Sequence, residues 1–406
     1  MSGNGETRQR RALLIGDAGV ASGFARMNDA YVRGLQAAGW DVHVLGLNYL
    51  GDPHAFPYPI YPCMSYKGGD RFGLRRTVEL VERLRPDVVC LTNDPWNVQE
   101  YLKKIGNTPT VASLAVDGKN CRGNELNGLA HAIFWTEFGL REARLGGYIG
   151  TASVIPLGVD IDMYKPMKRS DVRSRLRLPD PVRDAFIIGV VGRNQPRKRL
   201  DLTLLYFAEW IRSHDVRDAF LFLHVGPTGD AGYDLLQLGK YLQISNRMIV
   251  SEPAIGQGAP ESSLAAMYSA FDIMLTTTQG EGWGLTTMEG MACGVPSIVP
   301  EWAALGEWPG DAALRVPCSG VACTLNGVNV VGGIADKDAT INALDFLYRD
   351  KMNREAFSGR GLELVIRPEF RWQTIGARFA EAVQSALEPK KLLSFGTRAR
   401  EEAAPL

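Results

Sequence analysis

Short apolar runs alternate with helical patterns along most of this chain, and this alternation restricts the fold more than any other feature. A strand buried on both faces of a parallel sheet needs consecutive apolar residues, and parallel neighbours need a helix between them. In the first half, strands are expected at residues 12–16, 41–47, 87–92, 110–116, 132–136 and 153–156. Between the first two, apolar residues from Phe24 to Leu35 recur every three or four positions, which predicts a helix that Gly39 ends.

The pattern stops between Leu157 and Ser170 and then starts again. The second half predicts strands at 186–192, 219–226, 248–251 and 272–277 and helices at 201–213, 261–270 and 372–387. A length of 406 residues suits two or three domains. We therefore predict an α/β protein of two doubly wound Rossmann-like domains, at 1–160 and 161–387. Residues 388–406 show no period and predict a peripheral tail.

Composition excludes several classes of protein. Lys plus Arg and Asp plus Glu both total 45, so no overall charge indicates a polybasic nucleic-acid binder. The six cysteines form no C-x-x-C pair, which argues against structural zinc and favours free thiols. The chain has no P-loop, G-x-S-x-G, H-E-x-x-H or G-x-G-x-x-G motif. It also has no apolar stretch long enough for a membrane span, so we expect a cytoplasmic protein.

The segment TTTQGEGWGLTTMEGMACGVPSIVP, residues 276–300, is the most informative. A strand ends, glycines open a turn, and a helix is expected to begin near Thr286, where free N–H groups and the helix dipole favour an anion. Glu281 and Glu289 would border that anion site and accept hydrogen bonds from sugar hydroxyls. The alternative for Glu289 is structural, because T-T-M-E matches a capping box.

A basic loop, GRNQPRKR at residues 192–199, follows the first strand of the second half. Four cations at the carboxyl end of a strand suit a diphosphate, since ligands of doubly wound sheets bind at this edge. The alternatives are a solvated loop and a nucleic-acid patch. Together with the helix start, the loop predicts a pocket for a nucleoside diphosphate.

These motifs resemble those of glycosyltransferase family 4, retaining enzymes of the GT-B fold. The resemblance rests on Arg193 and Lys198, five residues apart, and on Glu281 and Glu289, eight apart. Residues 153–166 and 19–46 are also similar to the domain junction and the first turn and helix of that family. The resemblance covers most of residues 12–387 and implies two Rossmann-like domains facing across a cleft. It places the donor in the C-terminal domain and the acceptor mainly in the N-terminal domain, onto which the last helix would cross back.

The resemblance also implies roles for single residues. Arg193 and Lys198 would hold the donor diphosphate, Glu281 would lie beside the hydroxyls of the transferred sugar, and Glu289 would bind the ribose. The remaining donor contacts would be backbone groups of Gly23, Gly284, Leu285 and Thr286. Retention without an obvious nucleophile would fit front-face attack, in which the leaving phosphate takes the proton of the acceptor. No cofactor or metal is expected.

Two acidic segments need separate comment: one departs from the family pattern, and the other resembles a metal-binding motif. Many members carry a histidine in the N-terminal cleft where this chain has VASLAVDGKN, so Asp117 is a candidate catalytic group on the acceptor side. Its alternative is a plain turn aspartate. Asp160 and Asp162 spell D-x-D, the metal motif of another glycosyltransferase fold, but they lie in the domain junction, where we expect no metal.

The donor would be a UDP-, GDP- or related sugar nucleotide, and the acceptor is less defined. Residues 48–62 and 93–96 look like segments of phage-encoded relatives, for which a hydroxymethylated pyrimidine in DNA is a reasonable acceptor. A glycan, a lipid or a virion protein is the alternative. Residues 66–85 hold six basic and three acidic side chains, which suits either a nucleic-acid backbone or a solvated helix face. A non-catalytic sugar-nucleotide-binding protein and an epimerase are rival functions.

Overall fold

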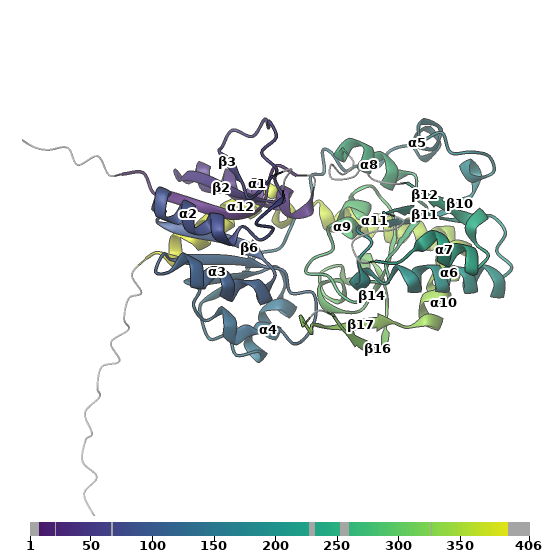
Figure 1. Ribbon diagram of the computed structural model, residues 1–406. Helices are drawn as coiled ribbons and strands as arrows, with labels where there is room; N and C mark the ends of the chain where they lie inside the picture. The colour runs from purple at the N-terminus through teal and green to yellow at the C-terminus, as the bar shows by residue number, and fades with distance from the viewer. Residues whose placement is uncertain are drawn as a thin grey trace, which may run out of the picture.

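Two parallel β-sheets, one in each half of the chain, organise the computed structural model (Figure 1). The structure describes residues 8–20, 22–65, 68–226, 232–251, 260–325 and 327–388. Apart from Glu388, the tail predicted at 388–406 lies outside the described residues.

The first sheet has seven parallel strands in the order β3-β2-β1-β6-β7-β8-β9. They are β1 (Arg11–Asp17), β2 (Asp41–Leu47), β3 (Ile60–Pro62), β6 (Val88–Asn93), β7 (Thr110–Leu114), β8 (His131–Phe134) and β9 (Ala152–Val154). The six predicted strands are confirmed to within a few residues, whereas β3 was not predicted. Because the order reverses between β1 and β6, these two strands flank the topological switch point of the sheet.

Helices cover both faces of this sheet, as successive strand residues require. Leu14 belongs to a core with α1 (Gly23–Ala37) and α12 (Trp372–Ala386). The neighbouring Leu13 belongs to a core with α2 (Leu74–Leu84), α3 (Val98–Ile105) and α4 (Glu137–Leu145). A short hairpin of β4 (Met64–Ser65) and β5 (Gly68–Gly69) precedes α2.

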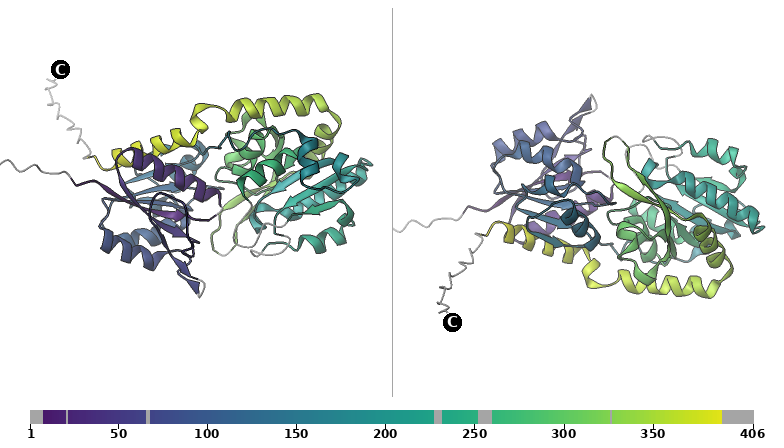
Figure 2. Two further views of the ribbon diagram at one scale, coloured as in Figure 1. Left: turned by 90° about the horizontal axis from the view of Figure 1, so that it is seen from above. Right: turned by 90° about the horizontal axis from the view of Figure 1, so that it is seen from below.

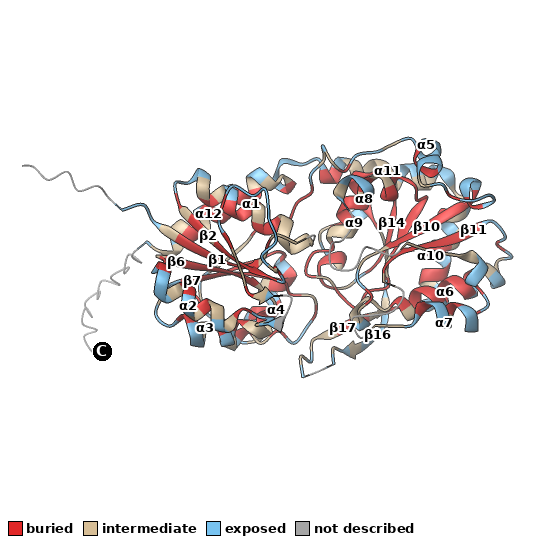
Figure 3. Cartoon of the chain, turned by 45° about the horizontal axis from the view of Figure 1, so that its top comes forward, coloured by how far each residue is buried: buried red, intermediate tan, exposed pale blue. Residues whose placement is uncertain are grey.

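The second sheet has six parallel strands in the order β12-β11-β10-β13-β14-β15, which is the Rossmann order. They are β10 (Phe186–Val191), β11 (Ala219–His224), β12 (Met248–Val250), β13 (Ile273–Leu275), β14 (Ser297–Pro300) and β15 (Leu314–Val316). One face packs on α6 (Leu200–Ser213), α7 (Leu235–Tyr241) and α10 (Lys337–Arg349). The other packs on α8 (Glu261–Ser269), α9 (Leu285–Ala292) and α11 (Lys351–Val365). The central strands of both sheets are almost entirely buried, whereas the edge strands β9 and β12 are only partly buried (Figure 3).

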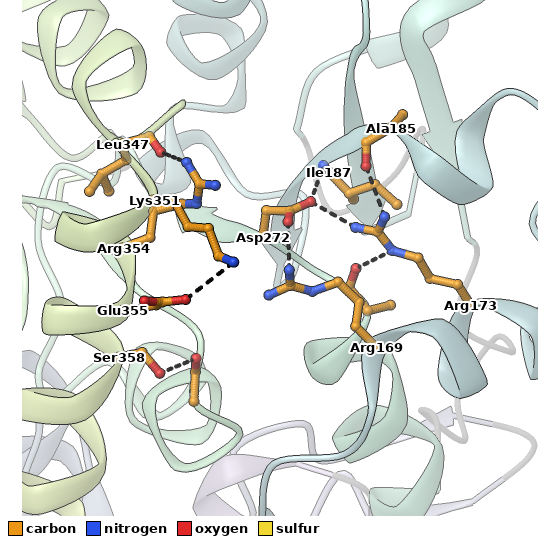
Figure 4. Close-up of polar contacts among 12 residues, drawn as sticks. Arg169, Arg173, Ala185, Ile187, Asp272, Leu347, Lys351, Arg354, Glu355 and Ser358 are labelled. Carbon is orange, nitrogen blue, oxygen red and sulfur yellow. Dashed lines mark hydrogen bonds and ion pairs between the residues drawn. The ribbon is translucent and has the colours of Figure 1, made fainter. Parts of the chain in front are cut away.

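The predicted boundary at 160/161 falls between β9 and β10, and the helix that follows it is tied to the second sheet. In α5 (Arg169–Arg175), Arg169 and Arg173 donate to the carboxylate of Asp272 at 2.8 and 2.7 Å (Figure 4). The same carboxylate accepts the backbone N–H of Ile187 in β10 at 2.8 Å. Charge-assisted bonds to a largely buried acid thus attach α5 to the second domain.

The last helix, α12, returns from the second domain to the first and lies beside α1 (Figure 2). The ring of Phe379 stacks on that of Tyr31, with centroids 3.9 Å apart. A second link between the domains, which was not predicted, is the antiparallel hairpin of β16 (Cys318–Cys323) and β17 (Val331–Ala335). Its Val331 exchanges backbone hydrogen bonds with Lys119 of the first domain, at 2.9 and 3.0 Å.

Candidate active site

Between the carboxyl ends of the two sheets lies a cleft of about 2090 Å³, lined by residues from both domains. All the candidate residues from the sequence line it: Gly23, Asp117, Arg193, Lys198, Glu281, Gly284, Leu285, Thr286 and Glu289. Sites for single drug-sized ligands span roughly 300–1,000 Å³. The cleft therefore has room for two substrates side by side.

The basic loop follows β10 and contributes its cations unequally. Arg193 and Lys198 line the cleft, as does Arg197. Arg199 has a left-handed backbone and turns to Asp201, to which it donates two hydrogen bonds at 3.0 and 2.8 Å. Arg199 therefore does not line the cleft, whereas the other three cations do, and Arg193 is the exposed one of the four.

Glu281, from the loop after β13, is held by two of these cations. Its carboxylate accepts a bond from Lys198 Nζ at 2.6 Å and pairs with Arg197 Nη1 at 3.2 Å. Burial by itself raises the pKa of Glu281, but the charges of Lys198 and Arg197 outweigh it and lower the pKa to about 2. Glu281 is therefore an anion at any physiological pH. Its bond to Lys198 fixes the position of the Lys198 ammonium group.

The start of α9 has the geometry expected of an anion site. Gly284 is its N-cap, with a left-handed φ of 93°, and no side chain caps the helix. The first N–H groups of a helix have no partner within it, so those of Leu285 and Thr286 point toward the cleft end of the helix. Gly23 of the first domain abuts this turn, because a Cβ built there would lie 2.6 Å from Leu285 Cδ1.

The carboxylate of Glu289 is buried one turn into α9, and the capping-box interpretation of this residue is wrong. Thr286 lies inside the helix, whose cap is Gly284, so it cannot exchange the bonds of a capping box with Glu289. Instead, Glu289 accepts a hydrogen bond from Tyr268 at 2.7 Å and another from Arg26 of the first domain. Burial raises the pKa of Glu289, and the charge of Arg26 opposes this.

Arg26 and Tyr268 were not identified from the sequence. Arg26 lies in α1 and reaches across the cleft, where it also donates to Tyr164 at 3.0 Å and lies 3.5 Å from Glu261. No local signal could have revealed the pair, because Arg26 and Glu289 are 263 residues apart.

Among the aspartates that line the cleft from the first domain, three lie at the carboxyl ends of β1, β6 and β7: Asp17, Asp94 and Asp117. Asp117, the predicted acceptor-side group, pairs with Arg197 Nε across the cleft at 3.0 Å. Asp17 accepts bonds from Ser22 at 2.8 Å and Asn48 at 3.0 Å. Burial raises the pKa of Asp94; the charges of Asp117 and Asp17 raise it further, whereas Arg197 opposes them. Asp94 was not predicted as a site residue.

Gly280 and Gly282 lie where the loop after β13 meets the first domain. A Cβ on Gly282 would lie 2.9 Å from Ala115 Cβ and 3.0 Å from Trp135. A Cβ on the preceding Gly280 would lie 1.8 Å from the Asp117 carbonyl oxygen. These glycines let the two domains approach each other.

The D-x-D sequence serves the local backbone. Asp160 Oδ1 accepts the N–H groups of Asp162 at 2.9 Å and Met163 at 3.1 Å, as in an Asx turn. Within the described ranges, no three His, Cys, Asp or Glu side chains gather as metal ligands would. The helices in those ranges include none with the length and apolar character of a membrane span.

Comparison with known proteins identifies relatives of this architecture. Residues 185–345, from just before β10 into α10, match the family model described as glycosyl transferases group 1. D-inositol 3-phosphate glycosyltransferase 1 of Catenulispora acidiphila is 30% identical over 196 residues, which are 46% of this chain and 44% of that one. The chain thus spans less than half the length of this relative.

Two solved structures match nearly the whole chain. Sucrose-phosphate synthase of Thermosynechococcus elongatus superposes with a TM-score of 0.72 at 19% identity, covering 93% of this chain and 99% of that one. HepE of Anabaena, in complex with UDP and glucose, gives a TM-score of 0.68 at 16% identity, covering 93% and 100%. The predicted GT-B fold, two Rossmann-like domains facing across a cleft, is confirmed.

Proposed function

We propose that this protein transfers a sugar from a nucleoside-diphosphate sugar to an acceptor hydroxyl, with retention at the anomeric carbon and without a metal. The observation that carries the proposal is the convergence of Lys198, Glu281 and the uncapped start of α9 at the switch point of the second sheet. Ligands of doubly wound sheets bind at this point. The match of residues 185–345 and the UDP complex of HepE support a nucleotide-sugar donor.

The proposed reaction follows from the charges on the donor side of the cleft, which we call the donor wall: Arg193, Lys198, Glu281, Glu289 and the start of α9. The bond from the anomeric carbon to the diphosphate breaks, a bond to the acceptor oxygen forms on the same face, and the acceptor proton passes to the leaving phosphate. Negative charge grows on the diphosphate, and Arg193, Lys198 and the first N–H groups of α9 would stabilise it. Glu281 would accept hydrogen bonds from the sugar, and Glu289 from the ribose.

The acceptor suggested by the sequence, a hydroxymethylated pyrimidine in DNA, gains no support. None of the described residues between 68 and 85, where most of the basic side chains of that stretch lie, lines the cleft. Arg76 is bonded to Glu79 on the surface of α2. The D-inositol 3-phosphate glycosyltransferase among the relatives adds a phosphorylated polyol to the acceptor classes that should be tested.

The test compares cations of the basic loop that differ in position. We expect Arg193→Ala and Lys198→Ala each to lower release of nucleoside diphosphate from UDP- or GDP-sugars by about 100-fold or more, as when one donor to a developing anion is lost. Arg199→Ala is the matched control, because Arg199 bonds to Asp201 and does not line the cleft.

The outcome separates the rival functions. An epimerase would release a free isomerised sugar, and a non-catalytic binding protein would bind the donor without releasing nucleoside diphosphate in the presence of any acceptor. Near-normal turnover in Lys198→Ala, with the fold intact by circular dichroism, would remove Lys198 from the mechanism.

A further inference from the structure

The acceptor side of the cleft has its own topological switch point, between β1 and β6. Asp17 ends β1 and Asp94 directly follows β6, so the two carboxylates flank this point, where a doubly wound sheet binds its ligand. Asp117 follows the next strand, β7, and completes an acidic row that faces the cationic wall of the second domain.

Positive charge from the first domain is already neutralised in the cleft. In the described ranges, only Arg26 and Arg33 of residues 8–160 line the cleft as cations. Arg26 pairs with Glu289, and Arg33 pairs with Asp29 at 2.7 Å. Of the cations on the facing side of the cleft, Arg193 acts on Asp17 and Arg197 pairs with Asp117. An acceptor phosphate placed beside Asp94 would therefore meet like charge and no unpaired cation from the described part of the first domain.

Aromatic surface accompanies the acidic row. Trp96, two residues after Asp94, is only partly buried, lines the cleft, and stacks on no described ring. A ring with an apolar face and a polar edge suits a sugar, whose C–H groups pack on the indole while its hydroxyls reach the neighbouring carboxylates. The carboxylate of Asp94 accepts no hydrogen bond from a described residue, so its lone pairs are available for such hydroxyls.

We propose that the acceptor is an uncharged polyhydroxylated molecule, a sugar or polyol without a phosphate near the reacting hydroxyl, which donates hydrogen bonds to Asp94 and packs on Trp96. This proposal rests on the proposed function, since it names the second substrate of the same cleft. Asp117, bonded to Arg197, connects the acceptor side to the donor side. The acidic row selects against anions, and the aromatic face selects for a ring.

The ionisation of Asp94 agrees with this geometry. Burial and the charge of Asp117 raise its pKa to about 7, against the opposing charge of Arg197. A further anion nearby would raise this pKa again, whereas hydroxyl donors favour the charged form of the carboxylate. A neutral hydroxylated ligand therefore stabilises an ionised Asp94, and a phosphate would destabilise it.

The first experiment tests donor binding and acceptor preference separately. Calorimetry with UDP and GDP tests the donor pocket of the whole protein. Release of nucleoside diphosphate from UDP-glucose, GDP-mannose and ADP-glucose is then measured with matched acceptors: glucose and its 6-phosphate, fructose and its 6-phosphate, inositol and its 3-phosphate, maltose, and hydroxymethylated DNA. We expect stimulation by at least one neutral acceptor and none by its phosphorylated partner.

Each other result has a definite meaning. Stimulation by a phosphorylated sugar or by DNA, or no stimulation by any neutral acceptor while a nucleotide binds, would overturn the neutral-acceptor proposal alone. Failure of UDP and GDP to bind would instead count against the proposed function.

The second experiment tests the two named side chains with the neutral acceptor identified in the first. We expect Asp94→Asn and Trp96→Ala to raise the acceptor KM by about tenfold or more, the cost of a lost charged hydrogen bond or a lost stacking surface. The dissociation constant for UDP should stay unchanged, which also shows that the variants fold. Asp94→Asn should in addition lower the ratio of activity with the neutral acceptor to activity with its phosphorylated partner. Loss of structure would lower both activities without changing this ratio.

Matched controls come from exposed positions away from the cleft. Glu363→Gln removes a carboxylate charge on α11, and Phe72→Ala removes an aromatic ring that is 42% exposed. Both should leave the acceptor KM unchanged. An unchanged KM and preference in Asp94→Asn would overturn its assignment as the acceptor-binding group.

Discussion

At the scale of single residues, the ion pair of Arg26 and Glu289 joins the two domains at the donor wall. The side chain of Glu289 is almost completely buried, at 4% exposed, and the side chain of Arg26 is 23% exposed. Tyr268 donates to the other carboxylate oxygen. A buried charge with both oxygens bonded is fixed in orientation, which is what recognition of a ribose would require.

Removing Arg26 should destabilise the protein in a pH-dependent way. Arg26→Ala leaves Glu289 buried beside Tyr268 alone, and we expect a loss of roughly 3 kcal/mol in the free energy of unfolding near neutral pH. Burial already raises the pKa of Glu289 above its usual value, and loss of Arg26 raises it further. A carboxyl whose folded-state pKa is raised makes the folded state bind more protons, so stability falls as the pH rises through that range.

The measurement is urea unfolding at pH 5 and pH 7.5. The deficit of Arg26→Ala relative to the wild type should be smaller at pH 5, where Glu289 can take up a proton. Arg26→Lys retains the charge and should lose less stability at pH 7.5. A deficit in Arg26→Ala that is equal at both pH values would contradict the ion-pair explanation.

The sequence revealed the residues whose signals are local and missed those that only folding brings together. Glu281 and Glu289 were visible because they share one turn and one helix start, and Arg193 and Lys198 because they share one loop. Arg26 lies in an ordinary amphipathic helix, and Asp94 precedes a proline in what reads as a turn. Their proximity to the other charges depends on the packing of two domains.

At the scale of elements, the contact between α1 and α12 depends on two glycines that face each other. A Cβ on Gly34 would lie 2.0 Å from the carbonyl oxygen of Gly376, and one on Gly376 would lie 2.4 Å from that of Ala30. The helices are therefore closer than side chains would allow, and backbone atoms, which cannot move independently, form the contact.

Gly376→Ala should separate these helices. We expect a loss of about 1–3 kcal/mol in the free energy of unfolding, because an added methyl group in a closed contact forces the backbone apart. Gly359→Ala is the matched control: this glycine is also inside a helix, α11, but a Cβ there would meet no atom within 4 Å. It should gain up to about 1 kcal/mol from helix propensity. Equal stabilities of the two variants by urea unfolding would refute the close-contact argument.

Long apolar runs and amphipathic periods were sufficient to predict most strands and several helices. The hairpin of β16 and β17 escaped prediction, since its sequences, CSGVAC and VGGIA, consist of small residues without a clear alternation. Its two strands pair with each other, and Val331 also pairs with Lys119 of the other domain. The local sequence pattern does not reveal this second partner.

At the scale of the whole molecule, links on several sides hold the two domains against each other. Arg26 and Glu289 connect them at the donor wall, and Arg197 and Asp117 connect them at the acceptor wall. On the hairpin side, Asn120 and Arg122 donate to the carbonyl oxygens of Asn329 and Gly327 at 2.9 and 2.6 Å. Glu289, which is assigned to the donor, is thus bonded across the domain interface, so any separation of the domains that admits a donor would break this bond.

A disulfide between the hairpin and the first domain should slow donor entry. Lys119 and Val331 exchange both backbone hydrogen bonds in an antiparallel bridge. Such a pair places its Cα atoms about 5.5 Å apart, within the range of roughly 4.4–6.8 Å that a disulfide spans. Cys323 lies opposite Val331 in the hairpin, so the test uses Lys119→Cys and Val331→Cys in a Cys323→Ser background.

If the domains must separate for the donor to enter, the oxidised protein should bind UDP with an association rate lower by about tenfold or more, since a required conformational change limits association. Reduction with dithiothreitol should restore the rate, and the Cys323→Ser background alone should associate at the same rate in oxidising and reducing buffer. Stopped-flow measurement of UDP binding gives these rates directly. Equal association rates for the oxidised and reduced double variant would mean that the cleft admits the donor without separation of the domains at the hairpin.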